Sequence, residues 1–370
     1  MSQGTVGFFS YHLSHCTVAE DFDVDVLVVG AGPGGGNAAL QCARKGLRTV
    51  LIEDHGEIGT PVHCGECISD EAVANLRLNL PPEVISKRVK GIRVIFPDGT
   101  SKQLTETGYV LEKHLFEQWI AQSAVKEGAK LSLKNRLSSM ERIEKDGKFL
   151  GWKCDGKGDI FPLTARIVID ASGVSAVCSK FVKLGNNKPL NEKGKVVAGM
   201  QYELADVPTD GYLDFYIWPK YAEKGYVWMI PKCDGRANVG LVTEDRPRAK
   251  KALDEFIADT HFNDLTRQLP QWKQKGSPTF GGTIPISGPF ENTHHDGLML
   301  IGDAAGFTSP LFEGGSHLAL KSAVFAAETA KIAIDKNDMS KEIMARYTSL
   351  WKAEFPPYEK ILKGKNALFE

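Results

Sequence analysis

The stretch from residue 23 to residue 54, DVDVLVVGAGPGGGNAALQCARKGLRTVLIED, constrains the fold more than any other part of the chain. Residues 24–29 form a short and nearly all-apolar run, as expected of a parallel strand that is buried on both faces. Small residues then recur at helical spacing up to Gly46, and a second apolar run, RTVLIE, ends at Glu53. We therefore predict a strand–helix–strand unit and an α/β fold.

Three glycines between the first strand and the helix give the pattern G-x-G-x-x-G, at Gly30, Gly32 and Gly35. Gly30 allows a tight turn, Gly32 lets the backbone approach a pyrophosphate, and Gly35 lets the helix lie close to the strand. The helix N-terminus offers N–H groups and partial positive charge to phosphates. Glu53 can accept hydrogen bonds from both ribose hydroxyls. This order of features predicts a dinucleotide site.

A second informative stretch, DGLMLIGDAAGFTSPLFEGGSHLALKSAVFAAETA, covers residues 296–330. Asp303 follows a short apolar strand, at the carboxyl end where ligands of open α/β sheets bind. Gly314 and Gly315 precede a long helix rich in small residues, so the N–H groups at 314–316 can face an electron-rich ring edge. Together with the first motif, this favours FAD over a nicotinamide cofactor.

Several separate stretches make the sequence similar to the geranylgeranyl reductase family of flavoproteins, with the fold of p-hydroxybenzoate hydroxylase. They are GPGGGNAALQCARKGLRTVLIEDHGEIGTPVHCGE, GYVLEKHLFEQWIAQSAVKEGAKL, ARIVIDASGV, DFYIWPKYAEKGYVWMIPKCDGRANVGL and the segment ending in LMLIGDAAGFTSPLFEGG. The resemblance implies a discontinuous, Rossmann-like FAD-binding domain and a β-rich substrate domain. The domain ranges that we expect are 22–82, 108–180 and 291–335 for FAD, and 83–107 and 181–290 for substrate. A tail at 1–21 and a helical segment at 336–370 complete the chain.

Three local patterns predict further elements. Residues 108–128, GYVLEKHLFEQWIAQSAVKEG, have apolar side chains near helical spacing and read as an amphipathic helix. The segment VKGIRVIFPDGTSKQL reads as a hairpin that turns at Asp98-Gly99. RPRAKKALDEFIADT reads as a helix within the substrate domain.

The resemblance also implies which residues contact FAD. Lys113 takes the place of a flavin-contacting arginine, and Ser172-Gly173 replaces the usual Asp-Gly after the third strand. With the residues of the glycine motif, the expected cofactor set is Gly30, Gly32, Gly35, Glu53, Cys64, Gly65, Glu66, Lys113, Leu137, Asp303, Gly314, Gly315 and Ser316.

The pair Cys64-x-x-Cys67 has three possible readings: a zinc knuckle, a redox dithiol or a loop beside the cofactor. Zinc needs two further ligands, and the sequence has no second C-x-x-C and no H-x-x-x-H, so no metal is predicted. The resemblance implies the loop beside the flavin ring. A dithiol that exchanges electrons with the flavin stays open as a hypothesis.

The alternating aromatic segment YVWMIPK begins at Tyr226 and reads as a half-buried strand. In the family it resembles, this element lines an isoprenoid pocket, so Tyr226, Trp228 and Pro231 are the expected substrate contacts. Three lysines near the pocket mouth are either ligands of a headgroup or solvated loop residues, of which we favour the second: Lys220, Lys224 and Lys232.

The resemblance implies saturation of C=C bonds of geranylgeranyl chains in membrane lipid precursors by hydride from reduced flavin. The proton comes from Cys64, from Glu66 or from the flavin through a water, and Cys64 is favoured for its position. Alternatives are reduction of a pigment or quinone tail, monooxygenation of a small aromatic, and a flavin-bound redox sensor. Only one dinucleotide motif is present, so NAD(P)H or a ferredoxin-like protein is expected to donate electrons in transient contact.

Composition sets limits on partners and compartment. The net charge of −1 gives no basic field for nucleic acid, and no apolar run is long enough to span a membrane. Seven scattered cysteines and the lack of a secretory signal pattern predict a cytoplasmic protein with reduced thiols. Because the expected substrate is a lipid, we also expect peripheral contact with the inner face of the cell membrane.

Overall fold

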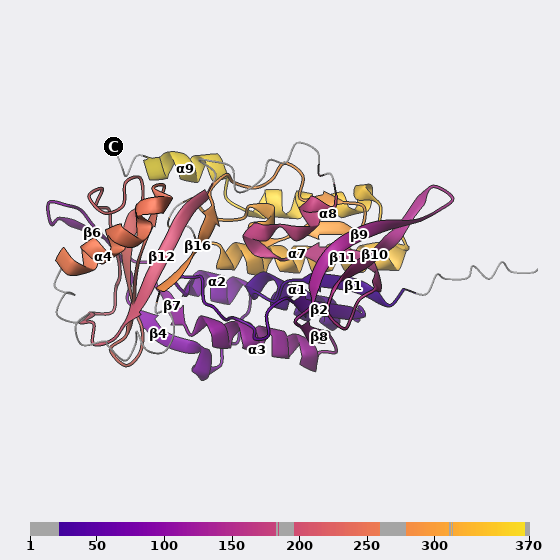
Figure 1. The fold of residues 1–370 in the computed structure, drawn as a ribbon, viewed down its shortest axis with the longest axis horizontal. Coiled ribbons are helices and arrows are strands. Elements are labelled where there is room, and N and C mark those ends of the chain that lie inside the picture. Colours follow the sequence, from indigo (N-terminus) through magenta and orange to yellow (C-terminus); the bar gives the residue numbers. More distant parts are fainter. Residues whose placement is uncertain are drawn as a thin grey trace, which may run out of the picture.

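The computed structural model describes residues 22–182, 184, 196–259, 279–310, 312 and 314–366. The expected tail at 1–21 lies outside the described residues. Figure 1 shows two large sheets at opposite ends of the long axis, with most of the helices packed around the one on the right. The α/β class predicted from the sequence is confirmed.

The first sheet has eight strands and holds the predicted strand–helix–strand unit at its centre. β1 (Val24–Val29) pairs in parallel with β2 (Thr49–Glu53) on one side and with β11 (Leu163–Asp170) on the other. All six residues of β1 are buried, as the apolar run predicted. The remaining strands are β8 (Lys130–Leu133), β9 (Arg136–Lys145), β10 (Lys148–Lys157), β17 (His294–His295) and β18 (Leu298–Leu300).

Helices pack against this sheet through small side chains. α1 (Pro33–Arg44) lies between α3 (Lys113–Lys126) and α7 (Ser316–Lys336), and its alanines and Cys42 are buried. Small residues let the axes of neighbouring helices approach closely. α1 and α7 lie on the same side of the sheet (Figure 1). α8 (Lys341–Glu354) packs on α7. α2 (Asp70–Asn75) lies near the centre of Figure 1 and α9 (Tyr358–Asn366) at its upper left.

The second sheet has seven strands and is mostly antiparallel. β5 (Ile92–Ile95) and β6 (Ser101–Leu104) form the hairpin predicted to turn at Asp98-Gly99. Helix α4 (Ala249–Asp259), also predicted, packs with its apolar face on β12 and β15. The other strands are β12 (Val196–Leu204), β13 (Leu213–Tyr216), β14 (Tyr226–Pro231), β15 (Ala237–Thr243) and β16 (Thr279–Pro285).

A small third sheet joins β3 (Cys67–Ser69), β7 (Gly108–Leu111) and β4 (Ile85–Val89). We expected one amphipathic helix over 108–128, but residues 108–111 form β7 and the helix begins only at Lys113. The difference arises because β3 and β4, which are distant in sequence, supply the hydrogen-bonding partners of β7. No helix in the described part of the chain is long and apolar enough to cross a membrane.

Candidate active site

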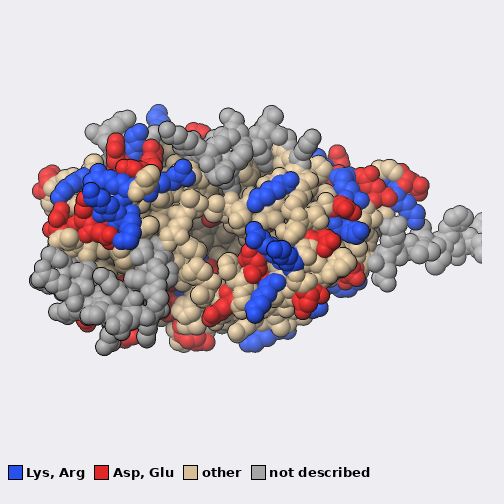
Figure 2. Space-filling model, viewed as in Figure 1, with Lys and Arg blue, Asp and Glu red and all other residues tan. Residues whose placement is uncertain are grey.

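One large cavity of about 1140 Å³ lies between the two main sheets. In Figure 2 the surface is hollowed near its centre, between the two ends of the molecule. The lining includes the loop after β1, the Cys64–Cys67 loop, the start of α7 and the inner face of the seven-stranded sheet. The volume exceeds the range of about 300–1,000 Å³ that is usual for one small ligand, so there is space for a dinucleotide and a second molecule.

The glycines after β1 differ in what surrounds them. A Cβ on Gly35 would lie 1.8 Å from the carbonyl oxygen of Gly30, and Gly30 itself has φ +97°. A Cβ on Gly32 would meet no atom within 4 Å, because this residue faces the cavity. Glu53 stands beside this turn, and its Oε2 accepts a hydrogen bond from the N–H of Ala31 at 2.8 Å. Gly30 and Gly35 shape the turn, while Gly32 leaves room for a ligand.

Two helices begin at the cavity with no side chain capping their first turns. The N-cap residues are Gly32 for α1 and Gly315 for α7, and both line the cavity. Gly314 and Ser316 line it as well, and nothing lies within 4 Å of a Cβ built on Gly314. The free N–H groups of such helix ends attract anionic or electron-rich ligand groups. This arrangement fits the pyrophosphate and the ring edge of FAD.

Three other residues expected at FAD also line the cavity, in different environments. Asp303 accepts a hydrogen bond from Thr308 Oγ1 at 3.2 Å, and burial raises the pKa of its carboxyl group. Leu137 lies at the start of β9 and is buried. The ammonium group of Lys113 contacts Glu117 Oε1 at 2.5 Å. Burial opposes this charge, but Glu117 and the neighbouring negative groups together outweigh burial and raise the pKa of Lys113.

The loop that holds Cys64 is fixed through Glu66. Glu66 has φ +71°, a strained value for a residue with a side chain, and its carboxylate is buried. Its backbone N–H donates to Cys64 Sγ at 3.2 Å, and its carbonyl accepts from Leu111 at 2.8 Å. Cys64 and Cys67 are free thiols, and burial raises the pKa of Cys67.

No metal site forms at this loop among the described residues. Their one group of three acidic, histidine or cysteine side chains close enough to share an ion is Glu53, Asp54 and His55, of which Asp54 and His55 are exposed. Cys64 and Cys67 are not in that group.

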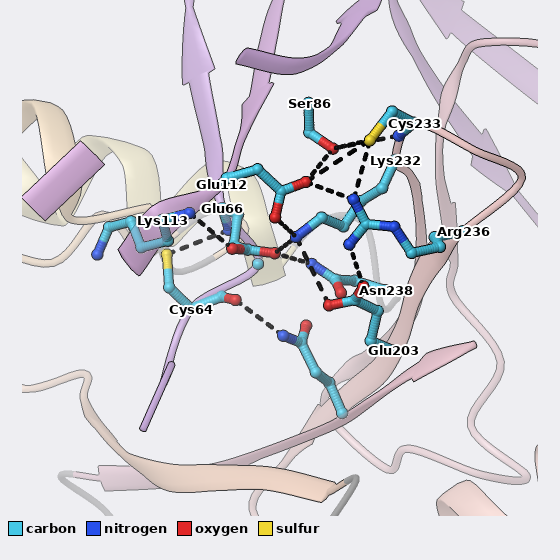
Figure 3. A network of polar contacts seen from close by, with 12 residues as sticks. Cys64, Glu66, Ser86, Glu112, Lys113, Glu203, Lys232, Cys233, Arg236 and Asn238 are labelled. Carbon is cyan, nitrogen blue, oxygen red and sulfur yellow. Dashed lines mark hydrogen bonds and ion pairs between the residues drawn. The ribbon is translucent and has the colours of Figure 1, made fainter. Parts of the chain in front are cut away.

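A buried cluster of charges, which no sequence pattern predicted, surrounds Glu66 (Figure 3). Lys232 Nζ lies 2.6 Å from Glu66, 3.1 Å from Glu112 and 3.6 Å from Glu203. The side chain of Lys232 is 2% exposed, so our interpretation of Lys232 as a solvated or headgroup-binding lysine is wrong. Lys220 and Lys224 are exposed and form ion pairs with Asp259 and Glu244. The cluster also includes Arg236, Asn238, Ser86 and Cys233.

The opposite wall of the cavity is apolar and aromatic. Tyr226, Trp228 and Ile230 share one face of β14 and line the cavity. Pro231 ends the strand and is not among the residues that line the cavity. Two aromatic residues extend the wall: Phe215 on β13, and Phe312, whose ring stacks on that of Phe215 at 4.4 Å between centroids.

The glycine turn, the carboxylate at the end of β2 and two uncapped helix ends thus form a site for a flavin dinucleotide. The family model for FAD-dependent oxidoreductases matches residues 25–225, and that for the geranylgeranyl reductase catalytic domain matches residues 196–270. The chain is therefore an FAD-dependent oxidoreductase, and FAD as the cofactor is confirmed.

Comparison with individual proteins narrows the class. The chain is 35% identical over 341 residues to the digeranylgeranylglycerophospholipid reductase of Methanocaldococcus jannaschii, which covers 90% of this chain and 83% of the relative. The reductase of the same name from Thermoplasma acidophilum is 34% identical over 90% of this chain and 84% of its own length. The chain belongs to this family of geranylgeranyl reductases, as the sequence resemblance indicated.

Solved structures agree with this assignment. A geranylgeranyl bacteriochlorophyll reductase-like protein from Thermoplasma acidophilum superposes with a TM-score of 0.80 at 32% identity, covering 94% of this chain and 87% of the other. A flavin-dependent brominase gives a TM-score of 0.68 at 20% identity, covering 88% of this chain and 83% of the other, and shows a shared fold alone.

Proposed function

We propose that this enzyme saturates C=C bonds in the geranylgeranyl chains of an archaeal-type membrane lipid precursor, such as a digeranylgeranylglycerophospholipid. One observation carries the proposal. The same cavity has the dinucleotide-binding glycines and helix ends in one part and the aromatic wall of Tyr226 and Trp228 in another. A long apolar chain needs an apolar channel beside the reactive ring, and this wall supplies it.

An isolated alkene is not polarised, so its reduction requires both a hydride and a proton. Reduced FAD, when bound, supplies the hydride. Cys64 is our candidate for delivering the proton, because it lines the same cavity as the cofactor residues and the aromatic face of β14. Glu66 was the other candidate among the side chains. Both of its oxygens already accept hydrogen bonds from N–H donors, so we assign it to holding the loop instead.

The apolar wall has a second task in this proposal. Protonation of one alkene carbon leaves cationic character on the other, and water would quench it. Side chains such as Ile230, Phe215 and Phe312 exclude water there, and the faces of aromatic rings favour a nearby positive charge. The cofactor contacts proposed above and the substrate contacts of Tyr226 and Trp228 belong to the same proposal.

The electron donor and the membrane contact are also proposals. One dinucleotide motif serves FAD, so NAD(P)H or a ferredoxin-like protein is proposed to reduce it in transient contact. Since the substrate resides in lipid, we propose that the enzyme works at the membrane surface from the cytoplasmic side.

The test is an anaerobic single-turnover reaction. Purified enzyme with bound FAD is reduced with dithionite and mixed with a digeranylgeranylglycerophospholipid. We expect the flavin to be reoxidised at the same rate as pairs of hydrogen atoms are added to the lipid, which mass spectrometry measures. Geranylgeranylated quinone and a small phenol with O2 are run in parallel. Reduced flavin that persists with the lipid, while the quinone tail gains hydrogen or the phenol is hydroxylated, would contradict the proposal.

A further inference from the structure

The carboxylate of Glu66 receives hydrogen bonds from two parts of the chain that are distant in sequence, the start of α3 and the β14–β15 hairpin. Its Oε1 accepts from the backbone N–H of Lys113, the first residue of α3, at 2.9 Å. Its Oε2 accepts from Lys232 Nζ and from Asn238 Nδ2, both at 2.6 Å. Figure 3 shows the carboxylate between Lys113 on one side and Lys232 and Asn238 on the other. Glu66 therefore joins the cofactor-side helix to the seven-stranded sheet.

Lys232 lies among several charged side chains that have little contact with solvent. Glu66, Glu112 and Glu203 face the two cations Lys232 and Arg236, which leaves one excess negative charge. Taking these groups out of water is costly, and well-packed apolar residues often replace such clusters without loss of stability. A role in fixing geometry explains the cluster better than a role in stability alone.

Both ends of the Lys232–Glu66 contact lie close to the proposed reactive groups. Lys232 directly follows β14, which presents Tyr226 and Trp228 to the cavity. Glu66 is two residues from Cys64, and its backbone N–H donates to the Cys64 sulfur. The φ of +71° at Glu66 is unfavourable by itself, so its partners must hold this backbone shape. A shift of Lys232 would thus be transmitted to the thiol.

We infer that Lys232 is a positioning residue, which holds the Cys64 loop in register with the substrate wall through Glu66. Lys232 is not among the residues that line the cavity, so it acts only through its partner. The inference deepens the proposed function and rests on it, because turnover is measured as reduction of geranylgeranyl chains. The placement of the Cys64 loop can be measured without any substrate.

The test compares Lys232→Met, Glu66→Gln and the double variant. Lys232→Met leaves two excess negative charges in the cluster, Glu66→Gln leaves none, and the double variant has one, as in the wild type. The double variant thus restores the charge balance but not the contact. Lys232→Met leaves carboxylates of the cluster unpaired and can fail to fold for that reason. In that case the other two variants still decide whether the contact positions the Cys64 loop.

Turnover is measured per bound FAD, below the melting temperature of every variant. We expect kcat to fall about tenfold to hundredfold in Glu66→Gln and in the double variant, because small misplacements near reacting groups cost this much. KM should change little. Alkylation of Cys64 by iodoacetamide, followed by peptide mass spectrometry in the absence of substrate, should become severalfold faster in both.

Two results would overturn the inference: kcat at the wild-type level in the double variant, or an unchanged alkylation rate of Cys64 in both variants. If wild-type enzyme reduces no geranylgeranyl chain, the proposed function fails, and the alkylation rates still decide whether Lys232 holds the loop. Lys331→Met with Asp335→Asn, which removes an exposed ion pair on α7, is the matched control and should leave every readout unchanged.

Discussion

The indole N–H of Trp228 donates a hydrogen bond to Gln201 Oε1 at 3.1 Å. The amide nitrogen of the same glutamine donates to the carbonyl oxygen of Cys64 at 2.9 Å. One side chain on β12 thus connects the proposed substrate wall with the loop of the proposed proton donor. Gln201 is 3% exposed, so water cannot easily replace either bond.

Replacement of Gln201 by methionine should lower both stability and turnover. Methionine keeps the approximate length of the side chain but leaves the Trp228 N–H and the Cys64 carbonyl without their partner. We expect a loss of about 1–3 kcal/mol in the free energy of unfolding, measured in urea with FAD bound. Gln103→Met, at an exposed position on β6, is the control. A Gln201 variant as stable and active as the control would contradict this account.

Alanine at two glycines of the same motif should produce opposite defects. Gly35→Ala places a methyl group 1.8 Å from the carbonyl oxygen of Gly30, so the backbone must shift, at a cost of about 1–3 kcal/mol or more. Gly32→Ala meets no protein atom within 4 Å but extends into the cavity. We expect Gly32→Ala to keep the stability of the FAD-free protein and to weaken FAD binding about tenfold or more. Thermal melts and flavin fluorescence titrations measure the two effects, and equal behaviour of both variants would refute the distinction.

The parts of the fold that the sequence predicted are those defined by local patterns. The turn from Gly30 to Gly35, the hairpin at Asp98-Gly99 and the helix after Gly315 each depend on residues close together in the chain. Apolar runs and glycine spacing report directly on such elements. Most residues expected at FAD line the same cavity for this reason.

The charge cluster could not be predicted because its members are far apart in sequence. Glu66 is 166 residues from Lys232 and 172 residues from Asn238. Lys232 stands between a proline and the turn before Arg236, where an exposed lysine is the usual expectation. No periodicity marks which distant charges meet in a folded chain. A lysine directly after a fully buried strand is the one local hint, and it is weak.

The cluster should make stability depend on pH through Glu112. Burial alone would raise the pKa of this carboxyl group, but hydrogen bonds from Ser86 and Arg236 and the charge of Lys232 lower it to about 2. Because this pKa is lower in the folded state, the ionised carboxylate stabilises the folded protein at pH values above the unfolded pKa of 4.5. This contribution is lost as the pH falls towards 2.

The matching variant is Glu112→Gln. It should be less stable than wild type at neutral pH by roughly 2 kcal/mol, a figure reduced for partial solvent screening. The difference should shrink as pH falls from about 4.5 to about 2. Urea unfolding across this range measures it. A difference that stays constant with pH would show that Glu112 is not the group that titrates.

Cys64 provides the most direct test of the proposed chemistry. If its thiol delivers the proton, Cys64→Ala should lose about 10²- to 10⁴-fold in the rate of lipid reduction per bound FAD, the usual contribution of a general acid. Cys67→Ala separates this role from a redox dithiol, since a dithiol needs both sulfurs. We expect Cys67→Ala to retain turnover, and the number of titratable thiols to be the same before and after flavin reduction. Full turnover in Cys64→Ala with bound FAD would exclude the thiol and leave a water on the flavin as the proton source.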